Sequence, residues 1–165
     1  MPGILFVCTG NLYRSPLAAA FFRAKLIADG RSDWTVDSAG TWTQPGQPVL
    51  PETIRAAAKF GADLEGHLSQ LISADLLSRF DLALVMEQGH KEALDQEFPF
   101  ASRKTHLISQ VVDCLVYDIP DPLSSGQELD ILASDLFKLV ERGYQTICGL
   151  AQDAAVSKPT LGDPP

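Results

Sequence analysis

Short apolar runs alternate along the chain with segments whose apolar residues recur at helical spacing. The first run, ILFV at residues 4–7, is continuously apolar, as is typical of a strand buried on both faces of a sheet. Further strands are predicted at residues 34–38, 82–86 and 105–108, and helices at residues 17–28, 51–60, 89–98 and 129–150. This alternation indicates an α/β fold with a mostly parallel sheet, whose ligand site lies at the carboxyl ends of the strands.

The composition indicates one globular domain. With 165 residues, 45% of them hydrophobic, the chain can bury a substantial core, and we expect a domain over residues 1–152 with a loose C-terminal tail over residues 153–165. The net charge of -8 argues against nucleic acid as a partner, because two negative surfaces repel. No apolar stretch approaches the roughly 20 residues of a membrane-spanning helix, so we expect no membrane insertion. Three irregularly spaced cysteines form neither a disulfide framework nor a zinc site, which favours a cytoplasmic location.

The first cysteine directly follows the first predicted strand and opens the segment CTGNLYRSP. Five residues separate Cys8 from Arg14, and Ser15 is predicted to be the N-cap of the next helix. Because Gly10 and Asn11 tolerate positive φ, the loop can turn its N–H groups inward around a tetrahedral oxyanion, which Arg14 would clamp. The same donors stabilise a thiolate, so we expect Cys8 to be a nucleophile. A lone cysteine at a strand end is usually a small core residue, but the surrounding loop favours catalysis.

The segment VCTGNLYRSPLAAAFF resembles the N-terminal signature of the low molecular weight protein tyrosine phosphatases. The resemblance continues through VDSAGT at residues 36–41, LALVMEQGHKEAL at residues 82–94 and IPDP at residues 119–122. It implies a three-layer, flavodoxin-like fold of the phosphotyrosine protein phosphatase I type, with helices on both faces of a four-stranded parallel sheet. It also implies hydrolysis of phosphotyrosine in proteins through a phosphocysteine intermediate, without metal or cofactor. The expected partners are a phosphotyrosine-containing protein and the phosphate ion.

The family resemblance also assigns roles by position. Cys8 corresponds to the nucleophile and Arg14 to the phosphate clamp. The residues expected to bind substrate are Thr9, Gly10, Asn11, Leu12, Tyr13, Ser15 and Trp42. The residues expected to support the loop are Asn11, Ser15, Ser38 and His67.

A proton donor for the leaving phenolate is expected in the segment VYDIPDPLSSG. Asp121 is followed by Pro122, which restricts the backbone and can hold the carboxyl group toward the pocket. By resemblance to the Asp-Pro loop of the family, Asp121 protonates the leaving oxygen and later activates the hydrolytic water. Without the cysteine loop, an Asp-Pro pair is as often a simple surface turn. Asp118 is the alternative acid, with a hydrogen bond within the loop as its expected role.

Three positions bear on substrate selectivity. Trp42 follows SAGT, where the family usually walls its pocket with an aromatic residue, whereas Leu123 replaces the aromatic residue that often follows Asp-Pro. Leu12 resembles the isoleucine of tyrosine-specific members, while arginine phosphatases of this fold tend to carry threonine there. Tyr13 stands where most relatives have a second cysteine. The pattern at Leu12 favours tyrosine phosphate.

Alternative functions on the same fold are a protein arginine phosphatase, an arsenate reductase-like enzyme and a non-catalytic phosphotyrosine-binding regulator. Arsenate reductases need further cysteines, and none occurs at residues 75–90. The presence of Cys8, Arg14 and Asp121 argues against a regulator that binds phosphotyrosine without hydrolysing it. Cys114 and Cys148 are interpreted as small buried residues, and the isolated His90 and His106 are assigned no chemistry.

Overall fold

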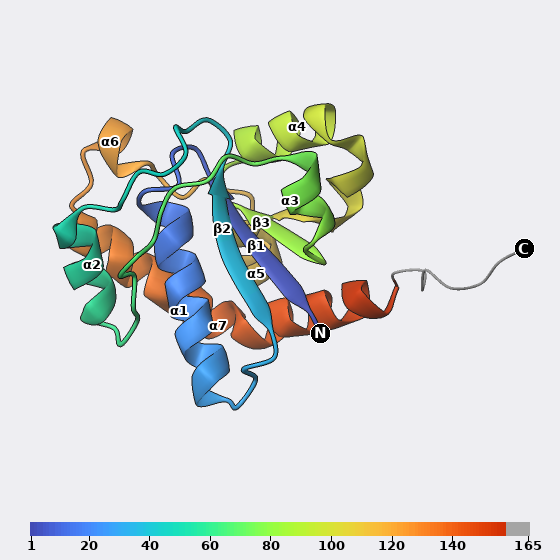
Figure 1. Cartoon of the computed structure of the whole chain (residues 1–165), viewed down its shortest axis with the longest axis horizontal. Helices are drawn as coiled ribbons and strands as arrows, with labels where there is room; N and C mark the ends of the chain where they lie inside the picture. The colour runs from blue at the N-terminus through green and yellow to red at the C-terminus, as the bar shows by residue number, and fades with distance from the viewer. Residues whose placement is uncertain (158–165) are drawn as a thin grey trace, which may run out of the picture.

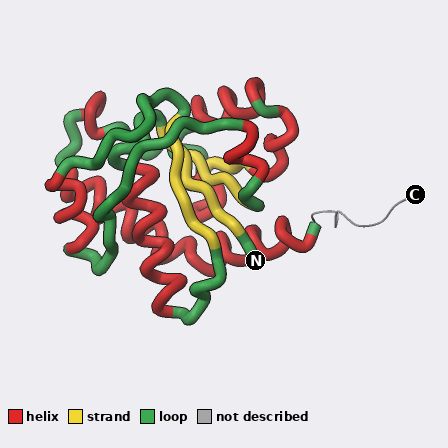
Figure 2. The backbone as a smooth tube through the Cα atoms, viewed as in Figure 1, coloured by secondary structure: helices red, strands yellow, loops and turns green. Residues whose placement is uncertain are grey.

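The computed structural model describes residues 1–157 and forms a parallel sheet from all the strands within them. The strand order is β2-β1-β3-β4, and helices lie on both faces, so the fold has three layers (Figures 1 and 2). The strands are β1 (Gly3–Cys8), β2 (Thr35–Gly40), β3 (Leu82–Val85) and β4 (Thr105–Leu107). The predicted fold class is confirmed, and each predicted strand is observed with bounds that differ by one or two residues.

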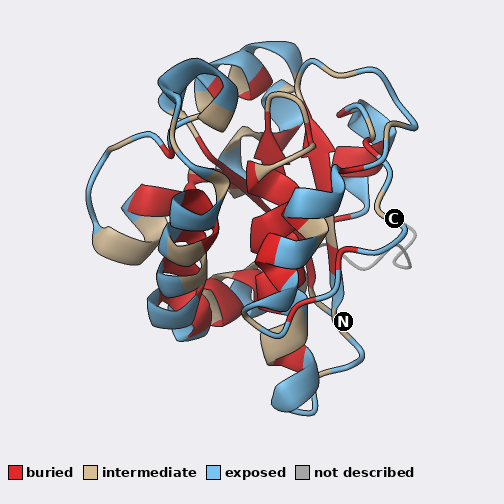
Figure 3. Ribbon diagram, turned by 90° about the vertical axis from the view of Figure 1, so that its left-hand side faces the viewer, coloured by how far each residue is buried: buried red, intermediate tan, exposed pale blue. Residues whose placement is uncertain are grey.

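Residues of β1 alternate between the two layers of helices, as the two-residue period of a strand requires. Ile4, Phe6 and Cys8 belong to one apolar cluster, and Leu5 and Val7 belong to the other. The first cluster is covered by α1 (Arg14–Ala28), α2 (Pro51–Ala58), α5 (Ile108–Asp113) and α7 (Leu129–Val156). The second is covered by α3 (Ala74–Ser78), α4 (Gln88–Glu97) and the 3-10 helix η1 (Pro99–Lys104). Figure 3 shows the buried residues along the sheet and the inward sides of these helices.

The strand register brings the carboxyl ends of the central strands to one edge of the sheet. Cys8 pairs with Gly40 of β2, and the preceding residue Val7 pairs with Val85 of β3. The loops that follow β1, β2 and β3 therefore begin side by side. Such an edge is where ligands bind in parallel α/β sheets.

The last helix is longer than the sequence pattern predicts. α7 continues to Val156, so the first residues of the predicted loose tail are helical, while residues 158–165 of that tail lie outside the described residues. The short helices α3, η1, α5 and α6 (Pro122–Ser125) were not predicted, because four to six residues are too few to show a helical period. Within residues 1–157, no helix is long and apolar enough to cross a membrane.

Candidate active site

Residues 8–14 form a tight loop between β1 and α1. The backbone N–H of Asn11 donates to Cys8 Sγ at 3.3 Å, and Ser15 Oγ lies 2.9 Å from the same sulfur. Asn11 adopts positive φ (55°) as predicted, whereas Gly10 does not. The predicted N-cap role of Ser15 was wrong: α1 begins at Arg14, with Tyr13 at the N-cap, so Ser15 lies inside the first turn. This position turns the hydroxyl toward the sulfur.

Asn11 is fully buried, and its polar groups connect the loop to three other segments. Its side-chain amide donates to Ser15 Oγ and to Ser38 Oγ, each at 2.9 Å. Its side-chain oxygen accepts from the Gln70 backbone N–H at 2.9 Å, and its carbonyl lies 2.9 Å from His67 Nε2. The structure thus brings all the predicted loop-support residues together around Asn11.

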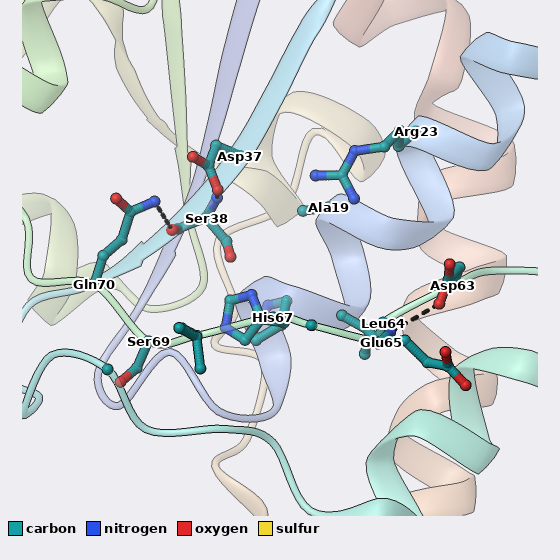
Figure 4. A pocket seen from close by; sticks show the side chains of 14 residues that line it. Ala19, Arg23, Asp37, Ser38, Asp63, Leu64, Glu65, His67, Ser69 and Gln70 are labelled. Atoms are coloured by element: carbon teal, nitrogen blue, oxygen red, sulfur yellow. Dashed lines mark hydrogen bonds between the residues drawn. The ribbon is translucent and has the colours of Figure 1, made fainter.

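Gln70 is a further support that the sequence interpretation missed. The Gln70 side-chain amide donates to the backbone carbonyl of Ser38 at 2.8 Å, and the Gln70 backbone carbonyl accepts from the Gly40 N–H at 2.9 Å. Ser38, His67 and Gln70 line a hollow of about 560 Å³ beside α1 and β2. Figure 4 shows the Gln70 side-chain amide directed at Ser38. No local pattern singled out Gln70, because its partners are distant in sequence.

Arg14 is 2% exposed, and its guanidinium is held by four groups. Nη1 donates to the Glu87 carboxylate and to the carbonyl of Ile119, the latter at 2.8 Å. Nη2 lies 3.4 Å from both Thr9 Oγ1 and Asp121 Oδ2. Glu87 was missed in the sequence, although an acidic residue just after a buried strand was a usable signal. These partners fix the guanidinium beside the loop.

His90 also belongs to the site, contrary to the interpretation that assigned it no chemistry. It is 5% exposed at the start of α4, where Nδ1 accepts from the Glu87 N–H at 3.1 Å and Nε2 lies 2.8 Å from Thr9 Oγ1. Burial lowers the pKa of His90 below its ordinary value of 6.5; Glu87 opposes this shift and Arg14 adds to it. The imidazole is therefore neutral at physiological pH.

Asp121 and Asp118 point to different partners. Asp121 is the N-cap of α6: its Oδ1 accepts from the Leu123 N–H at 3.0 Å while Oδ2 faces Arg14. Asp118 Oδ1 instead accepts from the Gln88 N–H at 2.8 Å, at the first residue of α4. Of these two aspartates, Asp121 is the one whose carboxylate faces Arg14, and Asp118 connects its loop to the start of α4.

A small cavity of about 40 Å³ opens at the loop. Its lining residues are Cys8, Gly10, Leu12, Tyr13, Arg14, Asp121 and Leu123. A shallower hollow shares two of these residues and is lined by Gly10, Leu12, Trp42, Thr43, Gln44 and Gln47. The side chains of Trp42 and Leu123 are 82% and 75% exposed, so both lie on the rim.

The other two cysteines lie in different environments. Cys148 is buried on α7, as predicted. The expectation for Cys114 was wrong, because it is exposed and adopts positive φ (56°) where α5 ends. The apolar sequence around it had suggested a buried element, but the helix stops there and the next two residues are also exposed.

Comparison with known proteins shows which family this site belongs to. The family model for "Low molecular weight phosphotyrosine protein phosphatase" matches residues 3–156. The low molecular weight protein-tyrosine-phosphatase Wzb of Escherichia coli K12 is 35% identical over 126 residues, covering 76% of this chain and 80% of Wzb.

Two solved structures resemble the chain over most of their length. A low molecular weight protein tyrosine phosphatase from T. tengcongensis has 32% identity and a TM-score of 0.79, covering 88% of this chain and 99% of its own. The YwlE arginine phosphatase from Geobacillus stearothermophilus has 26% identity and a TM-score of 0.78, covering 96% and 99%. The predicted family and enzyme class are confirmed: this chain belongs to the low molecular weight phosphotyrosine protein phosphatase family.

Proposed function

We propose that this enzyme hydrolyses phosphotyrosine in proteins, with Cys8 as nucleophile, Arg14 as phosphate clamp and Asp121 as general acid and base. The observation that carries the proposal is the 40 Å³ cavity, which these three side chains line together. A cavity of this size holds a group of a few atoms, such as a phosphoryl group. A reducing compartment such as the cytoplasm suits a nucleophilic thiolate.

In the first step, the Cys8 thiolate attacks phosphorus and the bond to the tyrosine oxygen breaks. Because a thiolate only accepts hydrogen bonds, the Ser15 hydroxyl donates to it, and the Asn11 N–H supplies a second donor. Arg14 neutralises charge on the phosphoryl oxygens as they become equatorial. Asp121 gives its proton to the leaving oxygen, so tyrosine departs neutral.

In the second step, Asp121 acts as a carboxylate. It takes a proton from a water molecule whose oxygen attacks the phosphorus of phosphocysteine. The S–P bond breaks, inorganic phosphate leaves and the Cys8 thiolate is restored. The Ser15 hydroxyl stabilises the departing thiolate through the 2.9 Å contact, as it stabilises the attacking thiolate in the first step.

Phosphoarginine is the competing substrate, because solved relatives include the YwlE arginine phosphatase. Leu12 lines both the phosphate cavity and the hollow beside Trp42, so the side chain that carries the phosphate contacts an apolar surface. An aromatic ring packs on such a wall, whereas a guanidinium gains no hydrogen bond from it. Leu12 therefore supports phosphotyrosine, and Leu12→Thr should raise the ratio of phosphoarginine to phosphotyrosine hydrolysis.

The proposal is tested by steady-state hydrolysis of a phosphotyrosine peptide and of p-nitrophenyl phosphate, with and without EDTA. We expect EDTA-insensitive turnover, inhibition by vanadate and no turnover by Cys8→Ser. Asp121→Asn should lower kcat about a hundred- to ten-thousandfold on phosphotyrosine, the scale of a lost general acid. The loss should be smaller on p-nitrophenyl phosphate, because its leaving group has a low pKa.

Asp118→Asn is the matched control, since it makes the same change in a neighbouring carboxylate. If it causes the larger loss, Asp121 is not the acid. Substantial turnover by Cys8→Ser contradicts the nucleophile assignment. Faster cleavage of phosphoarginine than of phosphotyrosine by the wild type contradicts the proposed substrate.

A further inference from the structure

We propose that His90 is a positioning residue for Arg14, acting as a neutral imidazole that holds two of the four groups on the guanidinium, Thr9 and Glu87. His90 touches neither the cavity nor the sulfur, so it acts through other side chains. The inference rests on the proposed function, in which Arg14 binds the phosphoryl group.

The hydrogen bonds of His90 define its tautomer. The partner of Nδ1 is the backbone N–H of Glu87, which can only donate, so Nδ1 must carry a lone pair. A neutral imidazole with an unprotonated Nδ1 carries its proton on Nε2. The 2.8 Å contact is therefore an Nε2–H donating to Thr9 Oγ1.

The first link from His90 to Arg14 runs through the Thr9 hydroxyl. Thr9 Oγ1 accepts from His90 Nε2 and lies 3.4 Å from Arg14 Nη2. The same oxygen therefore contacts the neutral imidazole and the cationic guanidinium. A threonine side chain on a loop is free to change rotamer unless something holds it. The buried imidazole holds the oxygen toward the arginine.

The second link runs through the turn that starts α4. The Glu87 carboxylate accepts from the backbone N–H of His90, while the His90 side chain accepts from the Glu87 N–H, so each residue caps the other. The same Glu87 carboxylate pairs with Arg14. Loss of the imidazole releases the turn that aims this carboxylate.

Several charged groups face His90 from three elements. Glu87 lies at the start of its own helix, Arg14 comes from α1, and Asp118 and Asp121 come from the loop before α6. The three carboxylates favour a charged imidazole, but burial outweighs them and the pKa is lowered. Protonation at acid pH would place an N–H at Nδ1 against the Glu87 N–H, which breaks the cap.

Two substitutions separate the two links. In His90→Asn the amide oxygen can take the place of Nδ1 and keep the cap, but the shorter side chain does not reach Thr9. In His90→Gln the longer side chain can return a donor to Thr9. We expect His90→Asn to lower kcat/KM and the affinity for inorganic phosphate roughly two- to tenfold, the scale of one hydrogen bond, with partial recovery in His90→Gln.

A double-mutant cycle with Thr9→Val tests whether His90 acts through Thr9. We expect His90→Asn to cause little further loss when the Thr9 hydroxyl is already absent. His106→Asn is the control, because His106 lies on β4 and lines a separate hollow with Asp81 and Lys104. It should leave kcat/KM unchanged.

The protonation state supplies a readout that is independent of turnover. ¹⁵N NMR of the imidazole should show the neutral Nε2–H tautomer of His90 at pH 7, and His90→Asn should remove one ionisation from the acidic limb of kcat/KM. The proposal is overturned if the His90 imidazole is protonated, or carries its proton on Nδ1, at pH 7. It is also overturned if His90→Asn lowers kcat/KM by the same factor in the wild type and in Thr9→Val, or if His90→Asn lowers Tm but leaves kcat/KM unchanged. The tautomer and the affinity for phosphate test the inference even if phosphotyrosine is not the substrate.

Discussion

Replacing Gly40 with alanine should displace the phosphate-binding loop. A Cβ at Gly40 would lie 2.5 Å from the carbonyl oxygen of Thr9, 3.0 Å from Thr43 Cγ2 and 3.2 Å from Asn11 Cβ. Because the nearest atom is backbone, no side-chain rotation relieves the contact, and the Thr9 carbonyl must move by about 1 Å to reach ordinary van der Waals distance.

This displacement has an expected size in both stability and rate. Overpacking of this kind lowers the free energy of unfolding by roughly 1 to 3 kcal/mol, which corresponds to a Tm lower by about 2 to 12 °C for a domain of this length. A shift of about 1 Å in catalytic groups lowers the rate by about a hundredfold, because the nucleophile and clamp no longer meet the phosphoryl group together. The measurements are thermal unfolding and kcat/KM on a phosphotyrosine peptide.

Two other glycines supply matched controls for Gly40→Ala. At Gly89 on α4 a Cβ would have no atom within 4 Å, so alanine should preserve kcat/KM and, because alanine favours helix, should not lower Tm. At Gly143 on α7 a Cβ would lie 2.4 Å from Val112 Cγ2, away from the loop, so alanine should lower Tm but not kcat/KM. Wild-type kcat/KM in Gly40→Ala would show that the loop absorbs the added methyl group and would refute the reasoning.

Three further predictions concern the loop, its redox chemistry and pH. Gly10 lines the cavity and has open space beside it, so Gly10→Ala should keep Tm but raise KM severalfold in steady-state assays. Peroxide should inactivate the enzyme rapidly, phosphate should protect it, and dithiothreitol should restore little activity; Tyr13→Cys should improve recovery by supplying a thiol to resolve the Cys8 sulfenate. Full reactivation of the wild type by dithiothreitol, with mass spectrometry of the peroxide-treated enzyme showing a Cys8 disulfide to Cys114 or Cys148, would contradict this. Because the pKa of His90 is lowered by folding, the unfolded chain binds more protons, so the free energy of unfolding should fall as pH drops from 6.5 toward the lowered value. Urea denaturation across this range should show a smaller fall in His90→Asn.

The fold was predictable because its determinants are local. The apolar run that became β1 and the helical spacing in α7 are visible within short windows of sequence. The errors also have local causes. The end of α7 was placed too early because the segment that follows Leu150 has no glycine or proline before Pro159, so no stop signal marks the true end.

The site could be predicted only where its functional residues lie close together in the sequence. Cys8 and Arg14 lie within one loop, so their spacing and the flanking strand and helix were informative. The partners of Arg14 were not predictable in this way, since Glu87 lies 73 residues away and the carbonyl of Ile119 lies 105 residues away. A histidine such as His90 shows its role only when the register of β1 and β3 brings the following turns together.

The groups that support catalysis and those that face the substrate differ in burial. Arg14 and Asn11 are at most 2% exposed and are held by hydrogen bonds to groups of other segments, so a change there alters both loop geometry and folding. Trp42 and Leu123 are mostly exposed, so their replacement removes little buried surface. Rim substitutions can therefore change the preferred phosphoprotein while the phosphoryl chemistry and Tm stay constant. The solved relatives of this chain include both a tyrosine phosphatase and an arginine phosphatase on one fold, as such a separation allows.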